Sequence, residues 1–127
     1  MNRQIKFRAW DKEEKRMTAP FGFEDIDGED GNEGYIQADK HQISSYDISQ
    51  GRYIFLQYTG LKDKNGKGIF EGDVVERADS SLRGEVHFWV ERGAWFVGDG
   101  DIELGKLPMD KIEVIGNIYE NKELLKQ

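Results

Sequence analysis

The sequence predicts a mainly β protein of a single domain, and three observations carry this prediction. The chain has 127 residues, a length at which one domain can bury one core. Apolar residues alternate with polar ones in several short runs, which is the two-residue period of a half-buried strand. Fifteen glycines supply turns between such runs, and a helical period is almost absent. This combination is typical of a small barrel or sandwich.

The first fifty residues are predicted to form an arm or extra sheet that packs on the main domain. Residues 3–10 alternate as a strand, and residues 17–23 return as a paired strand interrupted by a proline and a glycine. Residues 24–34 hold many acidic residues and glycines with only Ile26 for burial, so we expect a surface loop there. Residues 35–50 contain apolar residues without a clear period.

Residues 51–119 are predicted to form an SH3-like β-barrel whose strands begin near residue 52. The first strand, at about 52–59, is rich in aromatic and β-branched residues, which indicates burial on both of its faces. Residues 85–98 have the pattern of a hairpin, with Glu91, Arg92 and Gly93 in its turn.

The end of the chain continues this pattern and then changes. Short strands are expected at 102–104 and 112–118, where apolar residues again alternate. Residues 120–127 are predicted to form one or two helical turns capped by Asn121.

The stretch "QYTGLKDKNGKGIFEGDVV", residues 57–75, contains glycines and a Gly-Lys pair that suggest a phosphate-binding loop. A Walker loop needs four residues between its glycines and a hydroxyl after its lysine. Here five residues separate Gly60 from Gly66, and Gly68 follows Lys67. The pattern therefore favours a strand, a hairpin tip at Asn65-Gly66 and a second strand.

Charge is distributed unevenly along the chain, whose net charge is −7. Residues 1–16 contain six basic and three acidic residues, whereas residues 21–40 contain seven acidic residues and one lysine. Binding to a phosphate backbone needs a basic face, so the composition argues against a protein that binds nucleic acid unaided.

The composition also restricts the compartment. There is no cysteine, which excludes disulfides, thiolate catalysis and cysteine-ligated metals. Charges interrupt the amino-terminal apolar positions, unlike a signal peptide, and no apolar run approaches the length of a membrane span. We expect a cytoplasmic protein that does not contact membranes.

The acidic stretch resembles part of a calcium-binding loop. Asp25, Asp27 and Glu29 stand at alternate positions, like the first ligands of an EF-hand. The sixth position is Asp30 where glycine is needed, and the twelfth is Ile36 where a carboxylate is needed. We predict no metal or cofactor site, and weak calcium binding stays the alternative.

No catalytic motif is evident. His41 and His87 are the two residues that could act as general bases near neutral pH with an ordinary pKa, and neither stands in a nucleophile motif. Glu71 and Asp73 alternate around Gly72, a spacing common beside turns. We therefore predict that the protein is not an enzyme.

The aromatic residues offer the main indication of a binding surface. They are numerous for one core of this size, so some are expected at a surface. The candidate interaction residues are Trp10, Trp89, Trp95 and His87. The alternative to a binding surface is that these aromatic residues pack together in the core.

A weaker alternative is contact with nucleic acid through scattered cations. The candidates for such weak contacts are Arg3, Lys6, Arg8, Lys62, Lys64 and Lys67.

Three blocks of the sequence resemble the signatures of the YopX-like family of small phage and prophage proteins. They are "IKFRAWDKEEKRM", "QYTGLKDKNGKGIFEGDVV" and "VIGNIYENKELL", and they follow one another in the family's order. The resemblance implies a mostly β fold with an SH3-like carboxy-terminal part, a phage or prophage origin and expression in a bacterial host. It implies no established activity and no catalytic residues.

The functional expectation is therefore a non-enzymatic protein-interaction or self-assembly module. Its partners would be further copies of itself, or a phage or host protein. The alternative is an accessory nucleic-acid-binding protein in phage replication or gene regulation.

Overall fold

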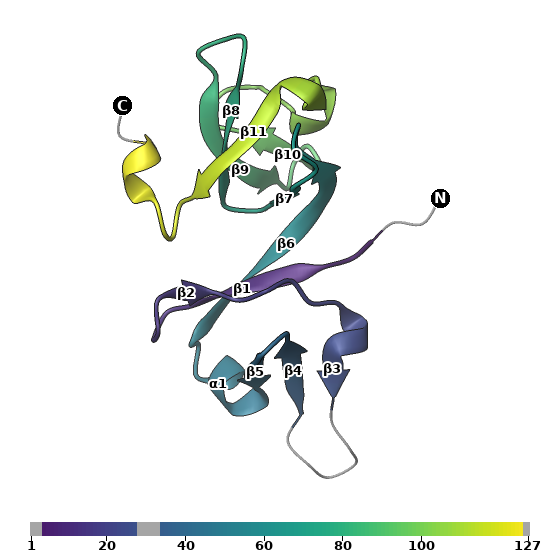
Figure 1. Cartoon of the computed structure of the whole chain (residues 1–127), viewed down its shortest axis with the longest axis vertical. Helices are drawn as coiled ribbons and strands as arrows, with labels where there is room; N and C mark the ends of the chain where they lie inside the picture. The colour runs from purple at the N-terminus through teal and green to yellow at the C-terminus, as the bar shows by residue number, and fades with distance from the viewer. Residues whose placement is uncertain (1–3, 28–33, 126–127) are drawn as a thin grey trace. The chain divides into compact units, whose positions relative to one another are not determined.

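The chain forms two compact units, Met1–Gln57 and Tyr58–Gln127, and each is described by itself (Figure 1). The structure, a computed structural model, describes residues 4–27 and 34–125. Strands dominate both units, which confirms the predicted mainly β class. Within these described ranges, no helix has the length and apolar character required to span a bilayer.

Unit 1 contains a sheet built around β1 (Phe7–Asp11). This strand pairs antiparallel with β2 (Arg16–Met17) and with the first half of β6 (Tyr53–Lys62). Residues 17–23, predicted as a return strand interrupted by Pro20 and Gly22, pair with β1 only through the end of β2 and one bridge from Phe21 to Phe7.

A buried ion pair ties this sheet to the residue just before β6. The Asp11 carboxylate is fully buried and accepts hydrogen bonds from Arg52 Nε at 2.9 Å and Nη2 at 2.8 Å. It also accepts the N–H groups of Glu13 and Glu14, which closes the turn after β1. The Arg52 hydrogen bond lowers the pKa of Asp11 to about 2.

A second sheet of unit 1 has the order β3 (Ile26–Asp27), β4 (Tyr35–Ala38), β5 (His41–Ser44). Helix α1 (Ser45–Ser49) follows, and Ser44 Oγ caps it by accepting the Asp47 N–H. Residues 23–27 were largely predicted as surface loop. They instead form the 3₁₀ turn η1 (Phe23–Asp25) and β3, because the Asp25 carboxylate accepts the Gly22 N–H at 2.8 Å and fixes the turn.

The core of unit 1 is small. Its buried members are Ala9, Phe21, Ala38, Ile43 and Tyr53, with Phe7 and Ile36 packed against them. Contrary to the prediction that the first barrel strand is buried on both faces, Phe55 on β6 is 37% exposed. The rings of Phe21 and Tyr53 lie beside it but leave part of it uncovered.

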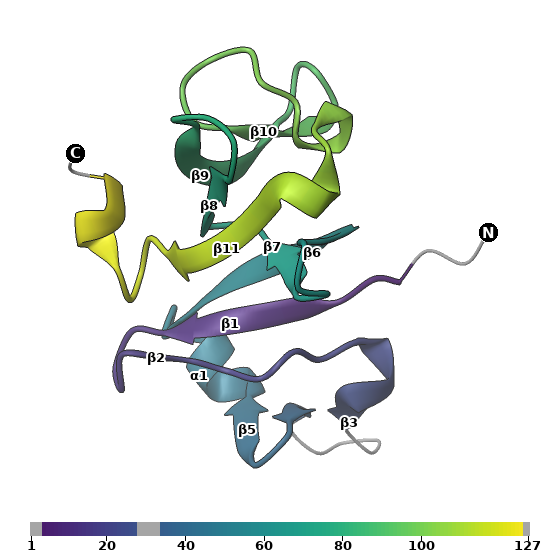
Figure 2. The ribbon, with the colours of Figure 1, turned by 45° about the horizontal axis from the view of Figure 1, so that its top comes forward.

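Unit 2 is organised by a curled antiparallel sheet of order β10-β9-β8-β11 (Figure 2). Its strands are β8 (Asp73–Arg77), β9 (Arg83–Trp89), β10 (Ala94–Val97) and β11 (Ile112–Asn117). The second half of β6 pairs with β7 (Gly68–Phe70). The predicted hairpin of residues 85–98 is confirmed, with Gly93 at a φ of 61° in its turn.

The predicted strand at 102–104 is reduced to a single bridge between Glu103 and Phe96. Two 3₁₀ turns follow, η2 (Leu104–Lys106) and η3 (Met109–Lys111). After β11, the tail predicted to be helical forms the 3₁₀ segment η4 (Lys122–Leu125) instead of an α-helix. The Asn121 side chain accepts the Asn117 N–H, which supports the turn that precedes η4.

The main buried cluster of unit 2 is aliphatic. Its fully buried members are Ile69, Val75, Val86, Val97, Leu104 and Ile112. Gly84 on β9 allows its backbone to approach the backbone of Gly98 closely, because a Cβ on Gly84 would stand 2.9 Å from the Gly98 backbone.

Candidate functional site

The glycine-rich stretch 57–75 is a hairpin whose own carboxylate occupies the tip. Asp63 Oδ1 accepts the N–H groups of Asn65 and Lys67, both at 2.9 Å, and Oδ2 accepts the Val114 N–H at 3.0 Å. Gly66 has a φ of 80°, as the predicted hairpin tip requires. The loop amides thus point at Asp63 and not at a ligand, which agrees with the failure of the phosphate-loop pattern.

These hydrogen bonds set the charge of the buried Asp63 carboxyl. Burial acts to raise its pKa, but the N–H groups of Val114, Lys67 and Asn65 outweigh it, so the pKa lies below its ordinary value. Asp63 is therefore a structural anion that joins the β6–β7 turn to β11.

The four candidate interaction residues do not come from one part of the chain. Trp10 lies on β1 in unit 1, whereas Trp89, Trp95 and His87 lie on the β9–β10 hairpin of unit 2. All four side chains are half-buried. Trp89 packs edge-on against Phe96 with 4.9 Å between ring centroids, and the Arg92 guanidinium lies 5.2 Å from the Trp89 centroid.

The hairpin also borders a shallow hollow of about 420 Å³. His87, Trp89 and Glu91 line it, together with Phe88, Val90 and residues 98–100. His87 Nε2 lies 2.7 Å from the Gly98 carbonyl oxygen, which fixes the ring. Burial raises the pKa of the neighbouring Glu85. The residues that line this hollow include no nucleophile paired with a base.

The remaining candidate catalytic groups have structural contacts. Asp73 is buried and accepts the Phe70 N–H at 2.8 Å. His41 lies in unit 1, with Nδ1 2.7 Å from Arg16 and Nε2 2.7 Å from the Tyr53 hydroxyl. His41 and His87 thus belong to different units.

The proposed calcium ligands are likewise engaged within the fold. Asp25 caps Gly22, and Asp27 accepts the Tyr35 hydroxyl at 3.1 Å, while Glu29 lies outside the described residues. Over the ranges 4–27 and 34–125, no group of three or more histidine or carboxylate ligands is placed to hold a metal.

The basic candidates divide between the units. Lys6 and Arg8 belong to unit 1, and Arg3 lies outside the described residues. Lys62, Lys64 and Lys67 surround the β6–β7 tip in unit 2, where Lys64 Nζ is 3.4 Å from Glu113.

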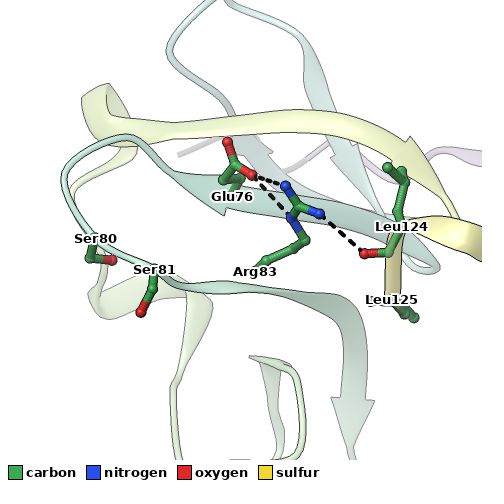
Figure 3. Close-up of a pocket in the computed structure, with 6 residues that line it drawn as sticks. All are labelled: Glu76, Ser80, Ser81, Arg83, Leu124 and Leu125. Carbon is green, nitrogen blue, oxygen red and sulfur yellow. Dashed lines mark hydrogen bonds and ion pairs between the residues drawn. The ribbon is translucent and has the colours of Figure 1, made fainter. Parts of the chain in front are cut away.

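A polar pocket of about 310 Å³ in unit 2 lies between the β8–β9 turn and the tail (Figure 3). Arg83 donates to Glu76 from Nε at 3.0 Å and from Nη2 at 2.7 Å, and its Nη1 reaches the Leu124 carbonyl at 3.5 Å. Because Glu76 balances the guanidinium, the pocket presents no net positive charge to an anion.

An apolar groove of about 230 Å³ lies within unit 1. We call it the phenylalanine groove, and it is lined by Phe7, Phe21, Gly22, Phe23, Ile26, Ile36 and Phe55. None of these described lining residues has a polar side chain. Phe23 is 62% exposed and Ile26 is 55% exposed, although both are large apolar residues.

Five chain segments position this groove. Phe7 and Phe21 exchange two backbone hydrogen bonds of 2.9 and 2.8 Å, and their rings stack at 6.4 Å. The Phe23 ring meets Phe7 edge-on at 6.4 Å, and Ile26 pairs with Ile36 across β3 and β4. Sequence reasoning missed the groove, because it assigned Phe21 and Phe23 to a paired strand and Ile26 to a surface loop. The "FGF" triplet at 21–23 was the available signal.

Comparison with known proteins identifies the family. The family model described as YopX protein matches residues 6–126. The chain belongs to the YopX family. This confirms the resemblance found in the three sequence blocks.

Two solved structures are similar to this YopX-family protein. The crystal structure of protein EF1440 from Enterococcus faecalis has 32% sequence identity and a TM-score of 0.64, with 98% of this chain and 99% of that chain covered. The X-ray structure of YopX from Bacillus subtilis has 20% identity and a TM-score of 0.56, with 96% of each chain covered, and shows the fold alone. No curated protein matches the chain.

Proposed function

We propose that this YopX-family protein is a non-enzymatic protein-interaction module whose docking site is the phenylalanine groove. The supporting observation is the exposed apolar surface around Phe23, Ile26 and Phe55, in a groove without polar lining. Exposed large apolar residues that gather in one place are characteristic of interaction sites. A phage or prophage origin and a role in the bacterial host cytoplasm belong to the same proposal.

The size of the groove favours one or two apolar side chains of a protein over a small-molecule ligand. At about 230 Å³ it is smaller than typical ligand pockets, which measure roughly 300–1,000 Å³. A cofactor also requires polar groups that fix its orientation, and the described lining residues offer no polar side chain. Aromatic walls suit an inserted aliphatic or aromatic anchor.

We assign the occupant to a different protein chain and not to a second copy. Two copies would each bring a net charge of −7, which opposes their approach. Self-assembly remains a measurable outcome. Nucleic-acid binding has weaker support, because the described basic residues that were candidates for it are divided between the two units.

For unit 2 we propose an SH3-like arrangement. Its curled antiparallel sheet of short strands around an aliphatic core supports this assignment. In this proposal unit 2 is the more rigid scaffold, and unit 1 carries the docking site.

The test is selection of short random displayed peptides on the wild-type protein, followed by measurement of dissociation constants. Phe23→Ser should weaken binding about tenfold or more, because it removes a central aromatic contact. Tyr46→Ser is the matched control, since Tyr46 is 60% exposed, also belongs to unit 1 and does not line the groove. Absence of selected peptides, or equal loss in both variants, would overturn the proposal.

Sedimentation velocity of the same proteins tests self-assembly. We expect the wild type and Phe23→Ser to sediment alike. A concentration-dependent oligomer that Phe23→Ser dissolves would show that a second copy occupies the groove, against our assignment.

A further inference from the structure

The rim of the phenylalanine groove is acidic. The segment that carries Phe23 and Ile26 reads "FEDID", so Glu24 and Asp25 lie between these two apolar lining residues and Asp27 follows them. Residues 17–27 contain no lysine or arginine. The approach to the groove from η1 and β3 is therefore lined by carboxylates.

Two of these carboxylates are placed at the rim by their contacts. The Glu24 oxygens lie 2.6 and 2.9 Å from the point where a Cβ on Gly22 would stand, so the carboxylate lies against a groove residue. Asp27 is oriented by the Tyr35 hydroxyl, and its hydrogen bond raises the pKa of that phenol. Asp25, by contrast, is occupied in capping Gly22.

Within residues 4–27 and 34–57, no cation is paired with this rim. Among the described residues, no lysine or arginine forms an ion pair with Glu24 or Asp27. Arg8 neighbours Phe7 in sequence, but successive side chains of a strand point to opposite faces, so it lies on the other face of β1. The groove thus combines an apolar floor with a negative edge.

We propose that the phenylalanine groove binds a basic segment of a partner protein, in which lysine or arginine residues flank an apolar anchor. The anchor fills the space among the phenylalanine rings, and the flanking cations approach Glu24 and Asp27. This inference rests on the proposed docking function and adds the charge of the partner. Charge complementarity of this kind selects partners and accelerates their encounter.

The test uses three synthetic peptides with one apolar centre, taken from a selected peptide, and flanks of lysine, glutamine or glutamate. We expect the dissociation constants to rise in that order, by about threefold for each charge contact, as exposed ion pairs allow. The difference should shrink as NaCl is raised, because salt screens exposed charges.

The variant Glu24→Gln with Asp27→Asn tests the rim itself. It should bind the lysine peptide about tenfold more weakly and leave binding of the glutamine peptide unchanged. Its control, Glu91→Gln with Glu123→Gln, changes the net charge equally at exposed positions of unit 2 and should retain the preference.

The outcomes separate the two proposals. Equal binding of the lysine and glutamate peptides, or an equal loss in the control variant, would overturn the basic partner while leaving Phe23-dependent docking intact. If no peptide binds in a manner that depends on Phe23, both the docking function and the basic partner are wrong.

Discussion

The two units use their apolar residues differently. Unit 2 buries Ile69, Val86 and Leu104 completely in a closed core. Unit 1 has a smaller core and leaves Phe23 and Ile26 more than half exposed. Its sheet is instead joined to the residue before β6 by the buried Asp11–Arg52 pair. The comparison indicates that unit 2 is stabilised chiefly by apolar packing, and that unit 1 combines a polar link with an apolar surface available for binding.

Arg52→Ala should give the largest effect, because it leaves the buried Asp11 carboxylate without its cation. We expect a loss of about 3–5 kcal/mol in the free energy of unfolding, as for other broken buried pairs. Urea denaturation measures the loss, and amide hydrogen exchange should place it in unit 1. Arg77→Ala removes a more exposed pair with Asp79 and should cost far less stability than Arg52→Ala, because solvent screens exposed ion pairs. Similar losses of unfolding free energy in Arg52→Ala and Arg77→Ala would contradict a special role of the buried Asp11–Arg52 pair.

Leu104→Ala should be the corresponding disruption of unit 2. Removal of a fully buried leucine side chain costs about 2–5 kcal/mol, because it loses apolar burial and leaves a cavity. Urea denaturation measures this cost, and hydrogen exchange should report faster opening of β8, β9 and β10. If Leu104→Ala unfolds at the same urea concentration as the wild type, apolar packing is not what chiefly stabilises unit 2.

Acid should weaken unit 1 through Asp11. Its folded-state pKa is lowered from 3.8 to about 2 by the Arg52 hydrogen bond, so its contribution is present above about pH 4. As pH falls through 4 toward 2, about 2 kcal/mol should be lost. Thermal denaturation across this range measures the loss. The lowered pKa of Asp63 gives unit 2 an acid dependence of the same sign.

The control for acid sensitivity is Asp11→Asn, which cannot ionise at this position. It should be less stable at neutral pH and show a flatter dependence below pH 4. A wild-type pH profile in this variant would mean that another group is responsible.

Phe23→Ser should give the smallest change in stability, and it tests whether the apolar surface of unit 1 serves binding and not folding. Because Phe23 is largely exposed, we expect the free energy of unfolding to change by about 0.5 kcal/mol or less. Peptide binding should nevertheless fall about tenfold. Urea denaturation measures the stability of the variant, and peptide titration measures its binding. A large loss of stability would instead identify Phe23 as a core residue.

Much of the fold follows from local sequence. The two-residue period predicted a strand at 3–10, observed at Phe7–Asp11, and a last strand at 112–118, observed at Ile112–Asn117. Turn residues such as Gly66 and Gly93 predicted the hairpin tip at Asn65-Gly66 and the hairpin at 85–98. Three blocks of sequence also indicated the YopX family, which the family model confirms.

The short elements were not readable in this way. Strand β3 has two residues, so it shows no period, and η1 depends on one side-chain cap from Asp25. The strand expected at 102–104 reduces to one bridge, because its residues turn directly into η2. In these cases the pairing partner decides the structure, and it is distant or irregular in sequence.

The candidate docking site shows the same division. By itself the sequence determined the family, the mainly β class and the local acidity beside Phe23, because composition and strand period are properties of neighbouring residues. Only the tertiary structure brought Phe7, Phe21 and Phe55 together and left Phe23 exposed beside them. Exposure depends on which surfaces cover one another, and that is decided by contacts between segments far apart along the chain.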